Sequence, residues 1–167
     1  MKRMFGIFSV IFASLIAQSL YYYPLLPETV AQHFDSQGKP NGWASREVFF
    51  AIYLGVTFLV MGMFLVIGCV LQKSPQYMNI PNKDHWLSPE NRDETIRTIT
   101  GGMALIGGLA GLLSLVVGQY AIQKNLTPGP IAMDAYILWL VLGFVGITLV
   151  WSISVTVKYM RPPPKHL

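Results

Sequence analysis

Charged residues are scarce in this sequence. Asp, Glu, Lys and Arg make up 12% of its 167 residues, while 53% are hydrophobic; an average soluble domain is about 25% charged. Four long stretches, residues 4–22, 48–71, 100–122 and 135–157, contain no Lys, Arg, Asp, Glu or His. This lack of charge excludes an ordinary soluble domain, whose surface helices need a polar face.

Ionisable side chains are also missing where a transporter or proton relay would need them. Such proteins keep a charged group inside the membrane, although it costs about 2.5–3.5 kcal/mol on insertion scales. The four stretches offer only amides near their ends, Gln18 and Gln119, and hydroxyls that can bond to their own helix. The single cysteine, Cys69, cannot form an internal disulfide and fits a small apolar packing residue. We therefore expect the stretches to be scaffold and the function to lie in the loops.

Long apolar runs are what the sequence has in abundance. A helix needs about 20 apolar residues to cross the hydrocarbon core of a bilayer, and each stretch is of that length. We predict one all-α integral membrane domain, residues 1–167, with four transmembrane helices. The first run follows Lys2 and Arg3 as a signal peptide would, but it exceeds the 7–15 apolar residues or so that are usual for one. We interpret it as the first span.

Four spans would divide the termini and loops between the two sides of a membrane, and Lys and Arg are distributed unequally between these sides. Nine of the twelve lie with the two termini and the middle loop. Because cytoplasmic flanks carry the excess, we expect both termini and loop 72–99 inside, and loop 23–46 outside. The nine are Lys2, Arg3, Lys73, Lys83, Arg92, Arg97, Lys158, Arg161 and Lys165, and the other three are Lys39, Arg46 and Lys124. Their position at span ends also accounts for the net charge of +4 without a nucleic-acid partner.

The third stretch is rich in small residues. Gly107 and Gly111 form a GxxxG motif, and Ala104 and Gly108 extend the small surface. Small residues allow helix backbones to approach closely in lipid. We therefore expect the third span at the centre of the bundle or at a homodimer contact.

The inner loop contains a helix start and a turn. Ser88-Pro89-Glu90 combines a capping residue, a first-turn proline and an acid, and predicts a short charged helix that begins near Pro89 and runs toward the third span. Before it, "NIPNKDHWL" predicts a turn anchored at the membrane surface. Its Lys83, Asp84 and His85 are consecutive and so point in different directions. The candidate cytoplasmic motif comprises Pro81, Asn82, Lys83, Asp84, Trp86, Leu87 and Arg92.

The outer loop, residues 23–46, is dense in turn residues and aromatics. Asp35 and Gly38 fit the ends of a type I turn, the run Pro40-Asn41-Gly42 fits a second turn, and Ser45 fits the cap of the second span. We therefore predict an ordered loop. The candidate recognition residues are Pro27, His33, Phe34, Asp35, Gly38, Gly42 and Trp43.

His33 and Asp35 are the residues of this loop with ligand potential. A zinc site needs three or four ligands, and no spacing supports Glu28 as a third. Hydrolysis needs a nucleophile with a base or a metal-bound water, and Ser36 beside His33 is weak support for that. We predict no catalytic residue, no metal and no cofactor.

Two segments carry a family resemblance. "YPLLPETVAQHFDSQGKPNGWAS" resembles the pattern "YPxLPxxVPxHFDxxGxPDGWxSK", with Ala31 where proline is preferred and Asn41 where Asp is frequent. "NIPNKDHWLSPENRDET" resembles "NLPNKDYWLAPERREET". The chain is thereby similar to a bacterial membrane family of unknown function, typified by the first half of the SdpI immunity protein. The resemblance implies a multi-pass protein of the bacterial cytoplasmic (inner) membrane, and either immunity to a secreted toxin or retention of a repressor at the membrane.

Three functional hypotheses remain from the sequence. The first is a binding module whose outer loop recognises a protein or peptide partner. The second is a structural or accessory subunit of a membrane complex, or a homo-oligomer, which the small residues of the third span favour. The third, a transporter or enzyme, has the least support because the spans lack charge.

Overall fold

Four long helices form the body of the molecule. In this computed structural model, residues 2–35, 37–127, 129 and 131–161 are described, apart from the side chains of Lys2, Arg3 and Ala132; Ser36 and Lys165 lie outside the described residues. The long helices are α1 (Lys2–Tyr22), α2 (Arg46–Lys73), α4 (Arg92–Leu126) and α5 (Ile137–Met160). Each of the four is long and apolar enough to cross a membrane. The prediction of four helices long and apolar enough to span a membrane is confirmed.

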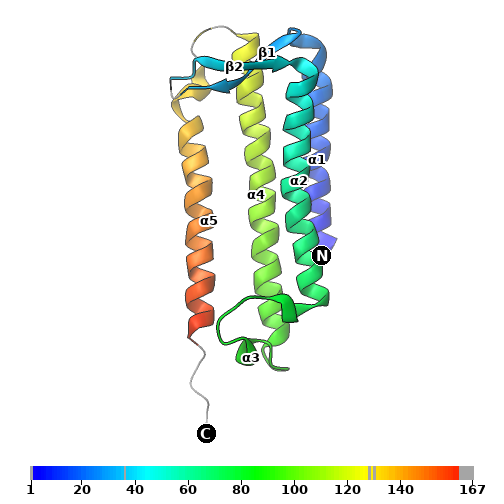
Figure 1. The fold of residues 1–167 in the computed structure, drawn as a ribbon, viewed down its shortest axis with the longest axis vertical. Coiled ribbons are helices and arrows are strands. Elements are labelled where there is room, and N and C mark those ends of the chain that lie inside the picture. The colour runs from blue at the N-terminus through cyan, green and yellow to red at the C-terminus, as the bar shows by residue number, and fades with distance from the viewer. Residues whose placement is uncertain (1, 36, 128, 130, 162–167) are drawn as a thin grey trace.

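The helices stand side by side, with α4 between the α1–α2 pair and α5 (Figure 1). The start of α1, the end of α5 and the short helix α3 (Lys83–Trp86) lie at one end of the bundle. The α1–α2 connection covers the other end, where α4 is joined to α5 by a loop with the 3-10 helix η3 (Ala132–Ala135). The two candidate motifs of the sequence therefore lie at opposite ends of the molecule.

The prediction of an all-α chain is wrong in the α1–α2 connection. After the 3-10 turn η1 (Tyr23–Leu25), residues Thr29–Phe34 form strand β1 and residues Pro40–Ser45 form strand β2. The strands pair antiparallel, with Thr29 opposite Ser45 and Ala31 opposite Trp43. Pairing satisfies backbone groups that a plain loop would leave without partners at the bundle end.

The connection between α2 and α4 also differs from the prediction. No separate helix begins near Pro89; α4 begins at Arg92 and runs without a break through Gly101 and Gly102. The Ser88 hydroxyl accepts a hydrogen bond from Asn91 Nδ2 (3.3 Å) and so does not cap the helix. The short helix of this loop is instead α3, which follows the 3-10 turn η2 (Pro75–Tyr77). At the other end of the bundle Ser45 caps α2 as predicted, accepting from Val48 N at 3.3 Å.

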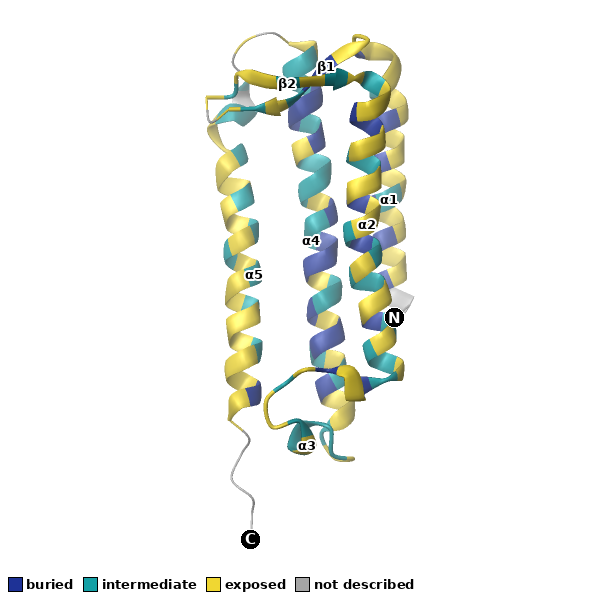
Figure 2. Ribbon diagram, in the orientation of Figure 1, coloured by how far each residue is buried: buried dark blue, intermediate teal, exposed yellow. Residues whose placement is uncertain are grey.

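Burial is concentrated on α4 and on the surfaces that face it (Figure 2). Among the described residues of α5, Tyr159 is the buried one. Three apolar clusters run along the bundle, one below the hairpin, one in the middle and one beside α3. Their buried members are Leu26, Val30, Phe49, Phe50, Ala121 and Ile122; Met4, Phe8, Ile11, Leu15 and Met61; and Met78, Ile99 and Tyr159. Many other large apolar side chains of the four helices are exposed, and apolar helix surfaces of this kind suit contact with lipid.

Candidate functional site

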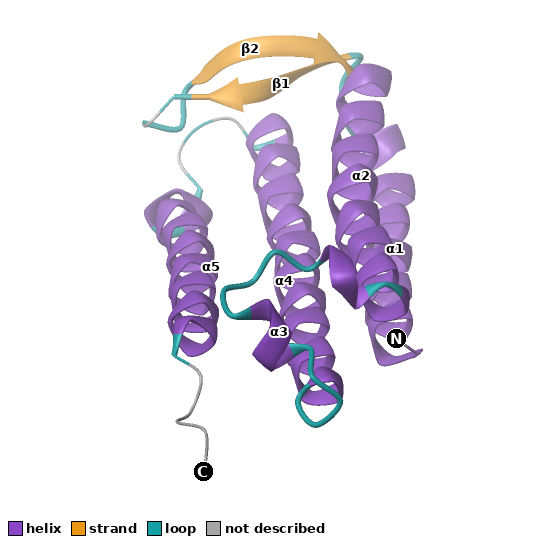
Figure 3. Cartoon of the chain, turned by 60° about the horizontal axis from the view of Figure 1, so that its bottom comes forward, coloured by secondary structure: helices purple, strands orange, loops and turns teal. Residues whose placement is uncertain are grey.

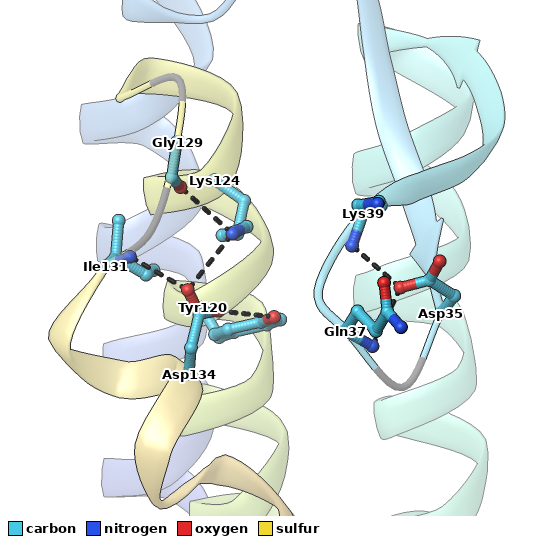
Figure 4. A network of polar contacts seen from close by, with 8 residues as sticks. All are labelled: Asp35, Gln37, Lys39, Tyr120, Lys124, Gly129, Ile131 and Asp134. Atoms are coloured by element: carbon cyan, nitrogen blue, oxygen red, sulfur yellow. Dashed lines mark hydrogen bonds and ion pairs between the residues drawn. The ribbon is translucent and has the colours of Figure 1, made fainter.

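The hairpin turn is closed by Asp35. Its carboxylate Oδ1 accepts hydrogen bonds from the backbone N–H groups of Gln37 (2.8 Å) and Lys39 (2.9 Å), as Figure 4 shows. Its carbonyl accepts from Gly38 N at 2.9 Å, the bond expected of a type I turn between Asp35 and Gly38. The carboxylate is therefore engaged in holding the turn.

The turn rests on a polar cluster made by Tyr120, Lys124 and Asp134, which we call the Asp134 cluster. Tyr120 donates to Asp134 Oδ1 (2.9 Å), and Lys124 Nζ lies 3.2 Å from Oδ2 (Figure 4). Gly38 has φ +72°, and a Cβ placed there would lie 3.0 Å from both the Tyr120 hydroxyl and Asp134 Oδ1. Only glycine combines this left-handed backbone with so close an approach.

Asp134 also organises the α4–α5 loop. Its Oδ2 accepts from the backbone N–H of Ile131 (2.8 Å), and Lys124 Nζ donates to Gly129 O (3.0 Å). The Ile131 N–H, followed by Tyr120 and Lys124, keeps the pKa of the Asp134 carboxyl below its usual value because each stabilises the charged form. The ring of Phe34 meets the Tyr120 ring edge-on, with centroids 5.6 Å apart. The turn end of the hairpin is thereby fixed to α4 and to the α4–α5 loop.

Asn125, near the end of α4, fixes β1 directly. Its Oδ1 accepts from Ala31 N (2.7 Å), and its Nδ2 donates to Ala31 O (2.8 Å) and to Ala121 O (2.8 Å). The side-chain amide thus takes the place of a neighbouring strand. Sequence reasoning missed this residue; the signal available was an amide directly after the third apolar stretch, opposite a long polar loop.

The two edges of the hairpin therefore differ. Ala31 and Trp43 are paired across the strands, and both backbone groups of Ala31 bond Asn125 instead of Trp43. In an antiparallel ladder such a pair points its N–H and C=O groups outward on both strands. Outside the β1–β2 ladder, the backbone N–H and C=O of Trp43 make no hydrogen bond within the described residues. β1 lies against the helices with Val30 and Ala31 buried, whereas β2 buries none of its residues (Figure 3).

A bulge in β1 turns Gln32 and His33 toward the helices. The register shifts between Ala31 and Phe34, and His33 pairs with Gly42. A Cβ on Gly42 would lie 2.9 Å from His33 Cδ2, so only glycine at this position leaves enough space for the His33 ring. Bulges commonly redirect a side chain in this way. Gln32 and His33 line one end of a groove of about 380 Å³ between α2 and α4.

Behind this groove, amides and phenols connect three helices. Tyr53 donates to Gln18 Oε1 (2.6 Å), and Gln18 Nε2 donates to Gln119 Oε1 (2.9 Å). Gln119 Nε2 in turn donates to the Tyr22 hydroxyl (3.0 Å). The two glutamines that sequence reasoning placed near span ends therefore bond each other and join α1, α2 and α4.

The entry to the hairpin is built around Arg46. Its Nη1 donates to Leu26 O (2.9 Å), and its guanidinium carbon lies 4.4 Å from the centroid of the Tyr23 ring. Leu26 is buried, while the predicted recognition residue Pro27, next to it, is exposed. Pro27 thus belongs to the hairpin's base, apart from the groove and from the open strand edge.

The second candidate motif, in residues 81–92, holds the end of α5. Asn82 Nδ2 donates to the carbonyls of Tyr159 (3.0 Å) and Met160 (3.1 Å), and Trp86 Nε1 donates to Tyr159 O (2.9 Å). Asn82 adopts the left-handed backbone conformation (φ 52°) that asparagine tolerates better than most residues. These bonds satisfy carbonyls that the end of a helix leaves free.

The other residues of this motif surround that contact. Pro81 and Asp84 are exposed, Lys83 Nζ donates to Gln76 O, and Leu87 packs against the cluster that contains Tyr159. Arg92 is the exposed first residue of α4. The structure thus brings together Asn82, Trp86 and Leu87 around the end of α5, and leaves the charged residues at the surface.

The small residues of α4 pack against helices of the same chain. A Cβ on Gly107 would lie 2.7 Å from Phe8 Cζ, and one on Gly111 would lie 2.7 Å from Met61 Sδ. Gly108 lies near Ile7, and Ala104 packs against the middle apolar cluster. The small residues therefore let α4 pack closely against α1 and α2 of the same chain.

No group of three or more His, Cys, Asp or Glu side chains that could hold a metal ion occurs in the described part of the chain. Asp35 closes the hairpin turn and His33 lines the groove, so the two residues serve different parts of the hairpin. The geometry offers hydrogen-bonding surfaces and an apolar groove.

The described fold defines a multi-pass membrane protein of mostly helical structure. A model of the family described as Domain of unknown function (DUF1648) matches residues 10–57. The matched segment runs from α1 through the hairpin into α2, and so includes β1, β2 and the α2 side of the groove. No curated protein and no solved structure matches the chain.

Proposed function

We propose that this protein is a recognition module of a bacterial cytoplasmic membrane, which captures an extended peptide by adding it as a third strand to β2. In this proposal the hairpin faces outward. The unequal distribution of Lys and Arg supports that orientation, because nine of the twelve lie with the termini and the middle loop. A partner would then reach the hairpin from outside the cell.

The open edge of β2 is the observation that carries the proposal. Asn125 occupies the edge of β1, whereas the backbone groups of Trp43 point outward on β2 and make no hydrogen bond outside the ladder among the described residues. An exposed edge with free N–H and C=O groups is the template for strand addition, in which backbone bonds give affinity and side-chain contacts give specificity. The Trp43 side chain, 59% exposed, supplies an aromatic surface beside that edge.

Rigid attachment supports binding by a preformed surface. The hairpin is fixed by Asn125 near its middle and by the Asp134 cluster at its turn. A partner that pairs with a strand already in place orders fewer residues on binding, and less of the interaction energy is lost to that ordering.

Binding is favoured over catalysis by the roles of the polar residues. The Asp35 carboxylate accepts two backbone hydrogen bonds that close the turn, which leaves it unsuited to orient His33 as a catalytic pair would require. We therefore propose that the protein is not an enzyme. The resemblance of this hairpin segment to the SdpI-type pattern favours a secreted peptide as the partner, with protection against that peptide as the outcome.

The test uses full-length protein in a strain that lacks the gene, exposed to peptides secreted by neighbouring bacteria. Trp43→Pro removes the outward N–H without breaking a bond to β1, since proline is tolerated at such edge positions. Trp43→Phe keeps the N–H and an aromatic ring. We expect the proline variant to lose protection and peptide capture while inserting normally, and the phenylalanine variant to keep both.

Two results would contradict strand addition. Equal protection by the proline and phenylalanine variants would show that the backbone edge of Trp43 is not used. Pairing of β2 with a second copy of the chain, detected as a dimer that Trp43→Pro dissociates, would replace a foreign peptide by a homotypic contact.

A further inference from the structure

The groove below β1 is separate from the open strand edge and is bounded by two spans. Its α2 wall contains Ile52, Tyr53 and Val56, and its α4 wall contains Val117 and Gly118. The Tyr53 ring packs so closely on α4 that a Cβ at Gly118 would lie 2.4 Å from Cζ. This contact forms the back of the groove. Its volume of about 380 Å³ is within the range of about 300–1,000 Å³ typical of ligand sites.

Polarity changes along the groove. At the hairpin end, the side chains of Gln32 and His33 line it and have no hydrogen-bond partner within the described part of the chain. Further along, the Tyr53 and Thr57 hydroxyls donate to Gln18 and to the Tyr53 carbonyl, so that these two groups are satisfied inside the protein. The walls there are mostly apolar. A ligand that matches this groove has one polar end and one apolar chain.

The position of the groove decides where such a ligand comes from. Ile52, Val56 and Val117 are exposed side chains of helices that are long and apolar enough to cross a membrane. In a bilayer crossed by these helices, the groove would open sideways toward the acyl chains, and its polar end at the hairpin would lie at the level of the lipid headgroups. A soluble ligand would have to cross that headgroup layer, whereas a lipid of the same leaflet is already adjacent.

We propose that this groove binds a phospholipid of the leaflet on the hairpin's side. One acyl chain lies between α2 and α4 against Tyr53, and the polar headgroup accepts hydrogen bonds from Gln32 and His33. The bulge in β1 is the feature that directs both side chains to this position. The site does not depend on peptide capture, because the groove lies beside β1 and the open edge belongs to β2.

The test uses the full chain in phosphatidylcholine nanodiscs that contain a trace of phosphatidylcholine with a photoreactive diazirine on one acyl chain. After irradiation, mass spectrometry locates the labelled residues. Val56→Trp fills the groove, and Val66→Trp is its control on the same helix. The two valines are similarly exposed, at 55% and 61%, but Val66 does not line the groove. We expect labelling concentrated on the groove walls of α2 and α4, loss of that labelling in Val56→Trp, and its retention in Val66→Trp.

A second variant tests the headgroup contact without changing the groove walls. Replacing both Gln32 and His33 by alanine leaves the apolar part intact, and Gln37→Ala, an exposed position in the hairpin turn, is the control. We expect weaker labelling of the groove in the double variant than in Gln37→Ala. Labelling spread evenly over all lipid-facing positions, or equal labelling of the two tryptophan variants, would overturn the proposal. Labelling of the groove by a diazirine fatty acid in preference to the phospholipid would overturn the choice of ligand.

Discussion

Replacing Asn125 by alanine tests how the hairpin is held on the bundle. The substitution removes three hydrogen bonds, two with the backbone of Ala31 and one with the carbonyl of Ala121. Ala31 is 4% exposed, so its N–H and C=O cannot simply turn to water. A buried backbone group left without a partner costs about 1–3 kcal/mol.

The expected cost follows from these groups. Two unpaired backbone groups of Ala31 would raise the free-energy cost of the substitution to several kcal/mol at most. Water can enter the half-buried position of the Asn125 side chain and bond these groups, which lowers the expected cost to about 2–3 kcal/mol. Because a factor of ten corresponds to about 1.4 kcal/mol, the population of hairpin detached from α4 rises about 30- to 150-fold. The bundle itself keeps its packing, since Asn125 lies at the end of α4.

Hydrogen exchange of the Ala31 amide measures this population directly. We expect the amide to exchange faster in Asn125→Ala by about the factor given above, while the amides in the middle of α4 are unchanged. Asn41→Ala, at an exposed position on β2, is the control and should leave the rate unchanged. An Ala31 amide that exchanges equally fast in wild type and Asn125→Ala would refute the role that we assign to the side chain.

The remaining predictions concern the turn, the helix packing and the pH response. Gly38→Ala should lower the thermal stability more than Gly129→Ala, because both positions have positive φ but only Gly38 has atoms within 4 Å of a new Cβ. Gly111→Ala should destabilise the protein by about 1–3 kcal/mol in denaturant titration, since its Cβ would lie 2.7 Å from a methionine sulfur of α2; Gly101→Ala, with free space, should be nearly neutral. Asp134 has a lowered pKa, so its stabilising contribution is present at neutral pH and is lost as the pH falls through that lowered pKa. Asp134→Asn should abolish this acid loosening of the hairpin turn, as followed by exchange of the Gly38 amide.

The four long helices could be predicted because their signal does not depend on tertiary contacts. A run of about 20 residues without charge is enough to indicate a span. The hairpin has no sequence signal of comparable strength. Its strands are six residues each, and β2 contains Pro40 and Gly42, which are typical of turns. The residues that pair in this hairpin are the ones whose local pattern indicated a loop.

The start of α4 shows a second limit of local reasoning. Ser88-Pro89-Glu90 has the composition of a helix start, yet the helix begins at Arg92. The Ser88 hydroxyl bonds the side chain of Asn91 instead of the helix. Capping patterns identify residues that can satisfy a free N–H, but neighbouring side chains compete for the same hydroxyl.

Asn125 and the groove could not be found from sequence because they depend on distant neighbours. Asn125 contacts Ala31, and the groove combines α2, α4 and a bulge in β1. The bulge arises from the register of two short strands, which a single sequence does not determine. Turn chemistry does not explain His33, and its position in the groove lining exists only once these elements are assembled.

Side-chain amides bond backbone groups at both ends of the bundle. Asn125 bonds the backbone of the hairpin, and Asn82 bonds the last carbonyls of α5. Between the ends, lipid is as apolar as the helix surfaces, so apolar contact gives little preference for one arrangement over another, and small residues such as Gly111 act through close packing. Directional hydrogen bonds at the ends therefore fix which segments meet. A surface suited to recognition can therefore be held rigidly at the hairpin end of the bundle.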